Sequence, residues 1–228
     1  MPRRLRLVEA PRGFIELNRG TGAHIAMTLT RAALSRKSAN KARVRSVTIP
    51  EQPYAPEKFK PSTIDRTIEN AGLLTEQIRN EAGRAIISRL EAGSASWGDI
   101  QAYAARVRAI GTGNCLEYAI VAFEKLCADG WRMLELVQLF PPSTHCFVIL
   151  GSARAPGAYD AGFPFAADVV VCDPWAHIAC DAAVYEREWA ARMQKWADER
   201  KEIFGGGQSI SPLNYTLQHR QLVMCSVR

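Results

Sequence analysis

The sequence feature that most constrains the fold is a change of hydrophobic period partway along the chain. Between residues 62 and 128, apolar side chains recur at helical spacing, whereas from residue 133 onward short apolar runs have the length and β-branched content of strands. A chain that places helices first and mostly antiparallel strands afterwards is typical of an α+β domain. We therefore expect a helical layer packed on an antiparallel sheet.

Caps and breakers divide this pattern into elements. One helix is predicted over residues 62–93, and a second begins after Ser96, where Asp99 completes a variant of the capping box. A third helix runs from Asn114 to Ala128, and a fourth is predicted over 181–207, with a stripe of Tyr, Trp and Met that is typical of core contacts. The predicted strands are 133–140, 145–151, 167–173 and the closing QLVMCSV, 221–227.

The N-terminal part of the chain differs from the rest in charge. Residues 1–46 contain eleven Arg or Lys and two Glu, a net charge of +9, so the rest of the chain carries −3 of the total +6. We expect this segment to be a basic, disordered arm with at most a weak helix near residues 26–34. Residues 47–61 contain four prolines and are predicted to be a linker, which leaves 62–228 as the folded domain.

Composition bears on three expectations: membrane insertion, secretion and the redox state of the cysteines. No apolar run reaches the ~18 residues of a spanning helix, and Glu9 and Arg12 interrupt the apolar core that a Sec signal peptide requires. The six cysteines are expected to be reduced thiols, because a chain of 228 residues can bury a core without disulfides. We expect a monomer without a cofactor.

The stretch GTGNCLEYA places a thiol at the start of a helix. Cys115 would face unsatisfied backbone N–H groups and the positive end of the helix dipole, both of which favour a thiolate. Gly111 and Gly113 permit a sharp turn, and Asn114 is a good N-cap. The sequence therefore predicts a nucleophile, although a buried small hydrophobe is the alternative for an isolated Cys.

Two strands supply possible partners for this thiol. His145 opens one strand and would act as general base, and Asp173 ends another, where it would orient the imidazole. If both face the site, strand alternation places Cys146 and Cys172 on the reverse, core-packing face. Taken singly, His145 could be a satisfied core histidine and Asp173 a turn residue before Pro174.

The ordered combination of these motifs resembles a known family. GNCLEYA, a strand that opens with His and a strand that ends in Asp-Pro-Trp are similar to the transglutaminase-like branch of the papain-like cysteine hydrolases. Within that branch they most resemble bacterial papain-fold toxins and effectors, including the glutamine deamidase domain of the Pasteurella toxin. The resemblance covers about residues 110–176 and implies a Cys115–His145–Asp173 triad on a papain-like fold.

The resemblance also implies an activity and a setting. We expect hydrolysis of an amide in a protein substrate through a thioester: deamidation of glutamine, proteolysis or, with an amine acceptor, transglutamination. The substrate would be a host protein, reached after export from a bacterial cytoplasm without a Sec signal, with the basic leader as a flexible export signal. The family's second oxyanion donor has no clear match. The candidates for that role or for contacts behind the site are Asn114, Gln101, Trp97 and Trp175, and Glu117 is expected at the surface or behind the site.

Two alternatives use other parts of the sequence. Cys172, His177 and Cys180, with His145 and Cys146, could supply zinc ligands, but the short paired spacing of structural zinc sites is missing, so we expect no metal. A non-enzymatic binding module is the other alternative. In it, the basic arm would contact nucleic acid or an anionic membrane, although the arm lacks the interleaved aromatic residues of many nucleic-acid binders.

Overall fold

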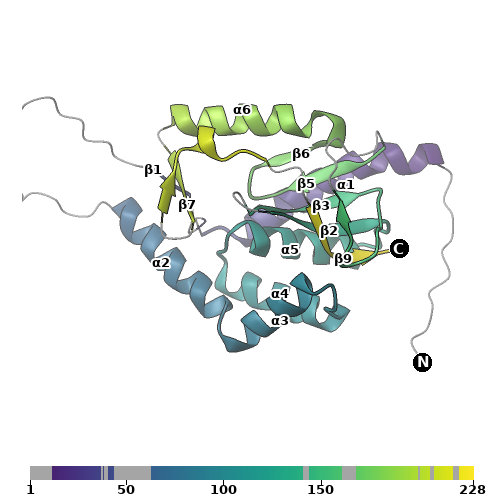
Figure 1. Ribbon diagram of the computed structural model, residues 1–228, viewed down its shortest axis with the longest axis horizontal. Coiled ribbons are helices and arrows are strands. Elements are labelled where there is room, and N and C mark those ends of the chain that lie inside the picture. The colour runs from purple at the N-terminus through teal and green to yellow at the C-terminus, as the bar shows by residue number, and fades with distance from the viewer. Residues whose placement is uncertain are drawn as a thin grey trace, which may run out of the picture.

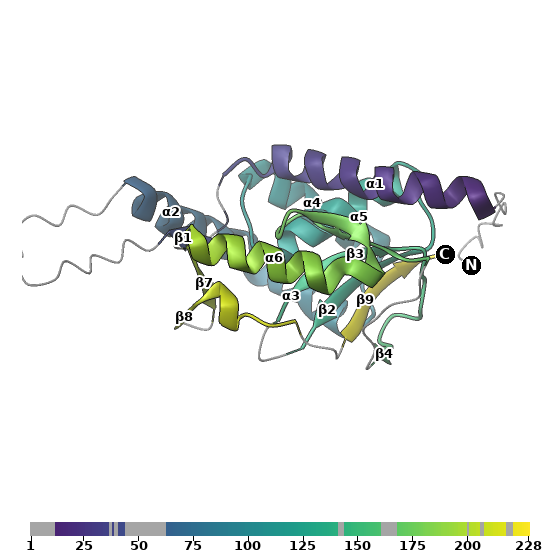
Figure 2. The same cartoon turned by 90° about the horizontal axis from the view of Figure 1, so that it is seen from above.

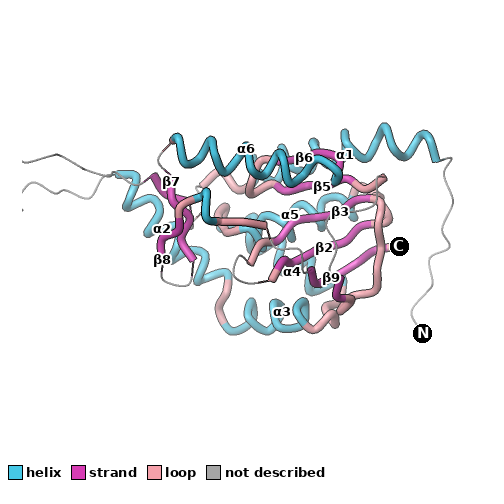
Figure 3. The backbone as a smooth tube through the Cα atoms, turned by 45° about the horizontal axis from the view of Figure 1, so that its top comes forward, coloured by secondary structure: helices cyan, strands magenta, loops and turns pink. Residues whose placement is uncertain are grey.

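A six-stranded antiparallel sheet forms the centre of the protein, which confirms the α+β class. The strand order is β4 (Tyr159–Asp160), β9 (Gln221–Val227), β2 (Leu134–Leu139), β3 (Cys146–Leu150), β5 (Val170–Asp173) and β6 (Ile178–Asp181). Figure 3 shows β9, β2, β3, β5 and β6 side by side in the middle of the molecule. The computed structural model describes residues 12–36, 38, 41–43, 63–140, 144–160, 168–199, 201–205, 208–217 and 221–228.

Helices cover both faces of the sheet (Figure 1). On one face α5 (Cys115–Ala128) packs on β2 and β3, and α1 (Arg12–Ala33) packs on β5 and β6. On the other face α6 (Tyr185–Asp198) follows the short 3₁₀ helix η2 (Ala182–Val184). Figure 2 shows α1 and α6 on opposite sides of the strands.

The remaining elements lie at the margins of these layers. Helix α4 (Trp97–Ile110) packs on α5, and α4 is itself contacted by α2 (Thr63–Ile78) and α3 (Glu81–Glu91). A small second sheet joins β1 (Lys41–Arg43), β7 (Lys201–Gly205) and β8 (Gln208–Ile210), and the 3₁₀ helix η3 (Pro212–Asn214) lies between β8 and β9.

The prediction of a disordered arm over residues 1–46 is wrong for α1. This helix buries Ala23, Ala26 and Met27 in the same core as the sheet. Its apolar face consists largely of small residues, and a Cβ added at Gly22 would lie 2.3 Å from the ring of Trp131. The helix therefore contributes to the core by close approach and not by large side chains, which is why the sequence pattern gives a weak signal.

Two predicted helices are also shorter in the structure. The helix predicted over 62–93 is divided into α2 and α3, because the side chain of Asn80 accepts a hydrogen bond from Gly83 N and caps a new helix. The helix predicted over 181–207 ends at Asp198, and residues 201–205 form β7. The predicted linker, residues 47–61, lies outside the described residues. The predicted strands at 133–140, 145–151, 167–173 and 221–227 correspond to β2, β3, β5 and β9.

Candidate active site

Cys115 lies at the first position of α5, as the sequence predicts. Asn114 is the N-cap residue in an extended conformation, and Gly111 ends α4 in the left-handed region at φ 78°. The two helices are therefore joined by a tight turn that places the cysteine at the start of its helix. Cys115 is half-buried as a residue.

His145 and Asp173 are joined by a buried hydrogen bond. His145 Nε2 lies 2.8 Å from Asp173 Oδ2, and the side chains are 1% and 0% exposed, respectively. The second ring nitrogen, Nδ1, is also buried, and within the described part of the chain it has no hydrogen-bond partner that meets normal geometry. This arrangement leaves Nδ1 as the nitrogen that can exchange a proton with a thiol.

Charges within the site raise the pKa of His145 and lower the pKa of Cys115. Burial lowers the pKa of His145, but the charge and hydrogen bond of Asp173, together with Cys115, raise that pKa to about 9. The hydrogen bond from Cys146 lowers the pKa of Cys115 most, burial opposes this, and His145 lowers it further, so that it lies well below its ordinary value. These two shifts favour a thiolate at Cys115 and an imidazolium at His145.

Besides its contact with His145, the Asp173 carboxylate accepts two further hydrogen bonds. The hydroxyl of Tyr185 donates to Oδ2 at 2.9 Å, and the backbone N–H of Ala176 donates to Oδ1 at 3.0 Å. Tyr185 was assigned by its helical spacing to core packing alone, so its contact with the carboxylate was missed. The Asp-Pro-Trp-Ala turn after β5 supplies the second donor.

Aromatic rings surround His145. The ring centroids of Trp175 and Trp189 lie 5.1 and 4.7 Å from the imidazole centroid, and Phe147 lies 5.9 Å from it. These rings keep water from the His145–Asp173 hydrogen bond. Trp189, like Tyr185, belongs to the stripe of α6 that the sequence assigned only to the core.

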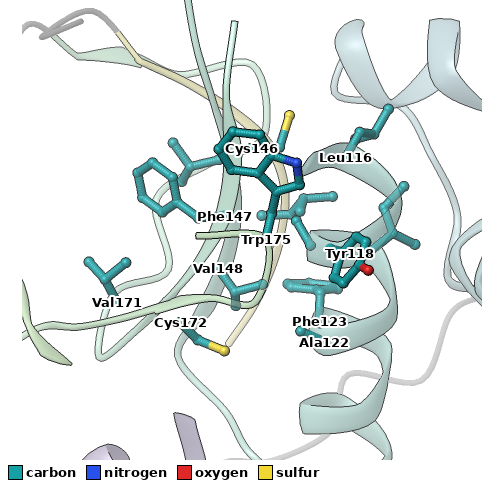
Figure 4. Packing of buried hydrophobic residues seen from close by; sticks show 14 of the residues in the cluster. Leu116, Tyr118, Ala122, Phe123, Cys146, Phe147, Val148, Val171, Cys172 and Trp175 are labelled. Carbon is teal, nitrogen blue, oxygen red and sulfur yellow. The ribbon is translucent and has the colours of Figure 1, made fainter. Parts of the chain in front are cut away.

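Cys146 and Cys172 lie together on the face opposite His145 and Asp173, as strand alternation predicts, but this face is not remote from the site, because α5 packs on it. Figure 4 shows Val148 pointing toward α5, and Phe147 and Val171 pointing away from it. Cys146 shares the face of Val148, on which α5 packs, and it lowers the pKa of the Cys115 thiol. Cys172 instead donates from Sγ to the carbonyl of Ala23 in α1 at 3.3 Å.

Glu117 is not at the surface. Its side chain is 0% exposed and forms an ion pair with Arg79, in which Arg79 Nε lies 2.8 Å from Glu117 Oε1. It also accepts hydrogen bonds from the hydroxyl of Tyr103 at 2.9 Å and from the backbone N–H of Asn114 at 2.8 Å. Of the two positions expected for Glu117, at the surface or behind the site, the structure shows the second, and partners from other helices compensate the buried charge.

The structure does not supply a second oxyanion donor from the expected set. The backbone N–H of Asn114 donates to Glu117, and Trp175 Nε1 donates to Ser38 Oγ at 3.2 Å. Gln101 is exposed on α4, and no interaction described for it joins it to the triad. Trp97 is 40% exposed. The backbone N–H of Cys115 at the helix start therefore remains the donor that the geometry supports.

The segment that ends α1 contacts both sides of the site. Ser38 accepts the hydrogen bond from Trp175 and donates to Asn114 Oδ1 at 3.4 Å. Arg31 Nη1 donates to the carbonyl of Pro174 at 2.8 Å, and Arg36 N donates to the carbonyl of Gly111 at 3.1 Å. This part of the predicted arm thus connects the turn before Cys115 with the turn after Asp173.

The residues proposed as zinc ligands do not come together. Within the described ranges, no group of three or more His, Cys, Asp or Glu side chains is arranged to hold a metal ion. Cys172 is buried against α1, whereas His177 is exposed at a turn with φ 65°. All six cysteines are free thiols.

Comparison with known proteins adds no relative. No protein-family model matches the chain, and neither a curated protein nor a solved structure matches it. None of the described helices is long and apolar enough to cross a lipid bilayer.

Proposed function

We propose that this protein is a cysteine-dependent amide hydrolase of the papain-like or transglutaminase-like type. Cys115 is the nucleophile, His145 the general acid and base, and Asp173 the residue that orients the imidazole. The observation that carries the proposal is the buried 2.8 Å bond between His145 Nε2 and Asp173 Oδ2, which leaves the opposite ring nitrogen for a thiol at a helix N-terminus. A helix that begins with the nucleophile and packs on an antiparallel sheet, as α5 does, agrees with such a fold.

The chemistry follows from these positions. The Cys115 thiolate attacks the carbonyl carbon of an amide, and the oxyanion forms near the N–H groups at the start of α5. The imidazolium of His145 gives its proton to the departing amine, and a thioester remains on Cys115. His145 then takes a proton from water, which attacks the thioester and releases a carboxylic acid and the thiol.

The resemblance of the motif to bacterial toxins favours a protein substrate, with a glutamine side chain or a peptide bond as the amide. We propose a host protein as that substrate and export from a bacterial cytoplasm without a Sec signal. Because α1 lies in the core, the export role of the basic leader cannot extend over the whole of residues 1–46.

The proposal is tested first without a substrate. Iodoacetamide should alkylate Cys115 well below pH 8 and much faster than Cys127, whose pKa burial raises to about 12. Mass spectrometry of the alkylated peptides separates the two sites. Equal rates at Cys115 and Cys127 would contradict the proposed nucleophile.

The second test identifies the bond. Incubation of candidate host proteins with the wild type and with Cys115→Ala should give a product only with the wild type. An increase of about one dalton at a glutamine indicates deamidation, because –OH replaces –NH2, whereas new termini indicate proteolysis.

A further inference from the structure

A fully buried carboxylate lies directly beneath the turn that carries the candidate nucleophile. Both oxygens of Glu117 are occupied: Oε1 by Arg79 Nε and Tyr103 OH, and Oε2 by Arg79 Nη2 at 2.9 Å and the backbone N–H of Asn114. Three separate segments therefore meet at one side chain: the end of α2, helix α4 and the turn before α5.

Such a cluster adds little net stability to the fold. The desolvation of a carboxylate and a guanidinium offsets most of their attraction, and replacing a buried ion pair by apolar residues is often neutral or stabilising. The ion pair instead fixes the position of the turn before Cys115. Its carboxylate bonds the residue immediately before Cys115, and Glu117 Cβ lies so close to Gly113 that a Cβ added at Gly113 would be 2.3 Å away.

The charge of Glu117 is compensated within the same cluster. A carboxylate two residues after Cys115 disfavours a second negative charge nearby, unless a cation compensates it. Arg79 supplies that cation and interacts electrostatically with both Glu117 and Cys115. Among the described residues, the other titratable groups that interact with Cys115 are His145 and Cys146 at the start of β3 and Tyr215 after η3.

We infer that Glu117 and Arg79 are positioning residues for the nucleophile: Glu117 holds the Gly113–Cys115 turn, and Arg79 cancels the charge that Glu117 would otherwise present to the sulfur. This inference rests on the proposed function and names residues that the resemblance does not supply. Neither side chain reacts with substrate, because both act through the turn and the charge of Cys115.

The test is the pH profile of Cys115 alkylation by iodoacetamide, measured on the full chain and resolved by mass spectrometry. Arg79→Gln should raise the midpoint of the profile by about one pH unit, because Glu117 is left uncompensated. Glu117→Gln should lower it, because the Arg79 cation remains, and should reduce turnover about tenfold or more by loosening the turn. The double variant should return the midpoint to near the wild-type value.

Two further variants distinguish this positioning role from a general loss of stability. Arg79→Lys keeps the charge and should keep the wild-type midpoint. Arg89→Gln is the matched control, because it removes an arginine from an ion pair with Asp99 on the surface, and it should not change the profile. Should Arg79→Gln not fold, as judged by its melt, Glu117→Gln and the double variant still decide the question.

Wild-type profiles in Arg79→Gln, Glu117→Gln and the double variant, with only melting temperatures changed, would overturn the inference and leave a purely structural ion pair. Failure of the proposed function looks different. In that case Cys115 of the wild type reacts no faster than Cys127, whatever the variants do.

Discussion

At the scale of single residues, the imidazole of His145 has two unlike nitrogens. Nε2 is bound to Asp173, which is itself held by Tyr185 and Ala176, so the ring cannot rotate without breaking a buried network. Nδ1 has no such partner in the described part of the chain. A ring fixed on one side and unbound on the other is suited to carrying a proton between a thiol and a leaving group.

The first prediction concerns pH. If Cys115 and His145 act as proposed, the thiolate–imidazolium pair forms above the lowered pKa of Cys115 and below the pKa of His145, which is raised to about 9. Activity should therefore fall as the pH rises through about 9, because His145 then lacks the proton that the leaving amine needs. Asp173→Asn removes the charge that raises this pKa and should move the basic limb to lower pH.

Activity and alkylation measured over the same pH range check this expectation. A basic limb near the ordinary histidine value of ~6.5 in the wild type would contradict it. So would an alkylation midpoint near the ordinary cysteine value.

The second prediction concerns Tyr185. Tyr185→Phe keeps the ring but removes one donor to the Asp173 carboxylate, so turnover should fall about tenfold as the imidazole loses its fixed orientation. The lost hydrogen bond to a charged group should cost ~1.5–3 kcal/mol of stability. Steady-state kinetics and thermal melts measure the two effects.

Tyr118→Phe is the control for Tyr185→Phe. It removes a buried hydroxyl that donates to the carbonyl of Leu34 at 3.2 Å. It should lower the melting temperature without changing turnover. Equal loss of turnover in the two variants would show that Tyr185 acts only through stability.

At the scale of elements, the start of α5 depends on a glycine that cannot be enlarged. The Cβ that alanine would add at Gly113 lies 2.3 Å from Glu117 Cβ and 2.8 Å from its Cγ. Because Glu117 is fixed by Arg79 and Tyr103, the contact cannot be relieved by rotating a free side chain. The turn itself has to move, and Cys115 moves with it.

The third prediction compares two glycines. Gly113→Ala should destabilise the fold by ~1–3 kcal/mol through overpacking and slow the alkylation of Cys115. Gly72→Ala should stabilise it by ~0.5–1 kcal/mol, because that glycine lies within α2 and a Cβ there meets nothing within 4 Å. Denaturant unfolding of both variants gives the sign, and a neutral Gly113→Ala would refute the steric argument.

At the scale of the whole molecule, the local features of the site were predictable and the supporting contacts were not. Asn114 and the glycine turn mark the helix start, and strand alternation separates His145 from Cys146, because these signals lie within a few residues. The partners of Glu117 and Tyr185 were missed because they are set by packing between elements. The catalytic role of the triad itself stays a prediction.

The same difference between local sequence signals and contacts set by packing explains why the N-terminal segment was predicted incorrectly. Charge dominates the composition of residues 1–46, and the apolar face of α1 is built from Gly22, Ala23 and Ala26, which carry little hydrophobic signal. Two of its cations are used inside the molecule, since Arg19 donates to the carbonyl of Asp168 and Arg31 to that of Pro174. Net charge alone therefore overstates how much of this segment is available to nucleic acid or membrane.

The fourth prediction follows from that packing. Deletion of residues 1–38 should abolish cooperative unfolding, because it uncovers the α1 side of β5 and removes the Ser38 link between Trp175 and Asn114. Circular dichroism melts of the deletion and of the full chain test it. A deletion that melts cooperatively near the wild-type temperature would show that α1 is dispensable. The binding alternative is therefore better tested by substituting exposed arginines than by deletion.

The position of α1 has a consequence for synthesis. Ala23 and Cys172, which are hydrogen bonded, lie 149 residues apart in the chain, as do Arg19 and Asp168. During translation α1 leaves the ribosome long before the strand on which it packs, and contacts between distant segments form late in folding. The nascent chain thus carries Cys115 without its imidazole and carboxylate partners until Asp173 and Tyr185 have emerged. The proposed thiol chemistry therefore requires that β5 and α6 have been synthesised.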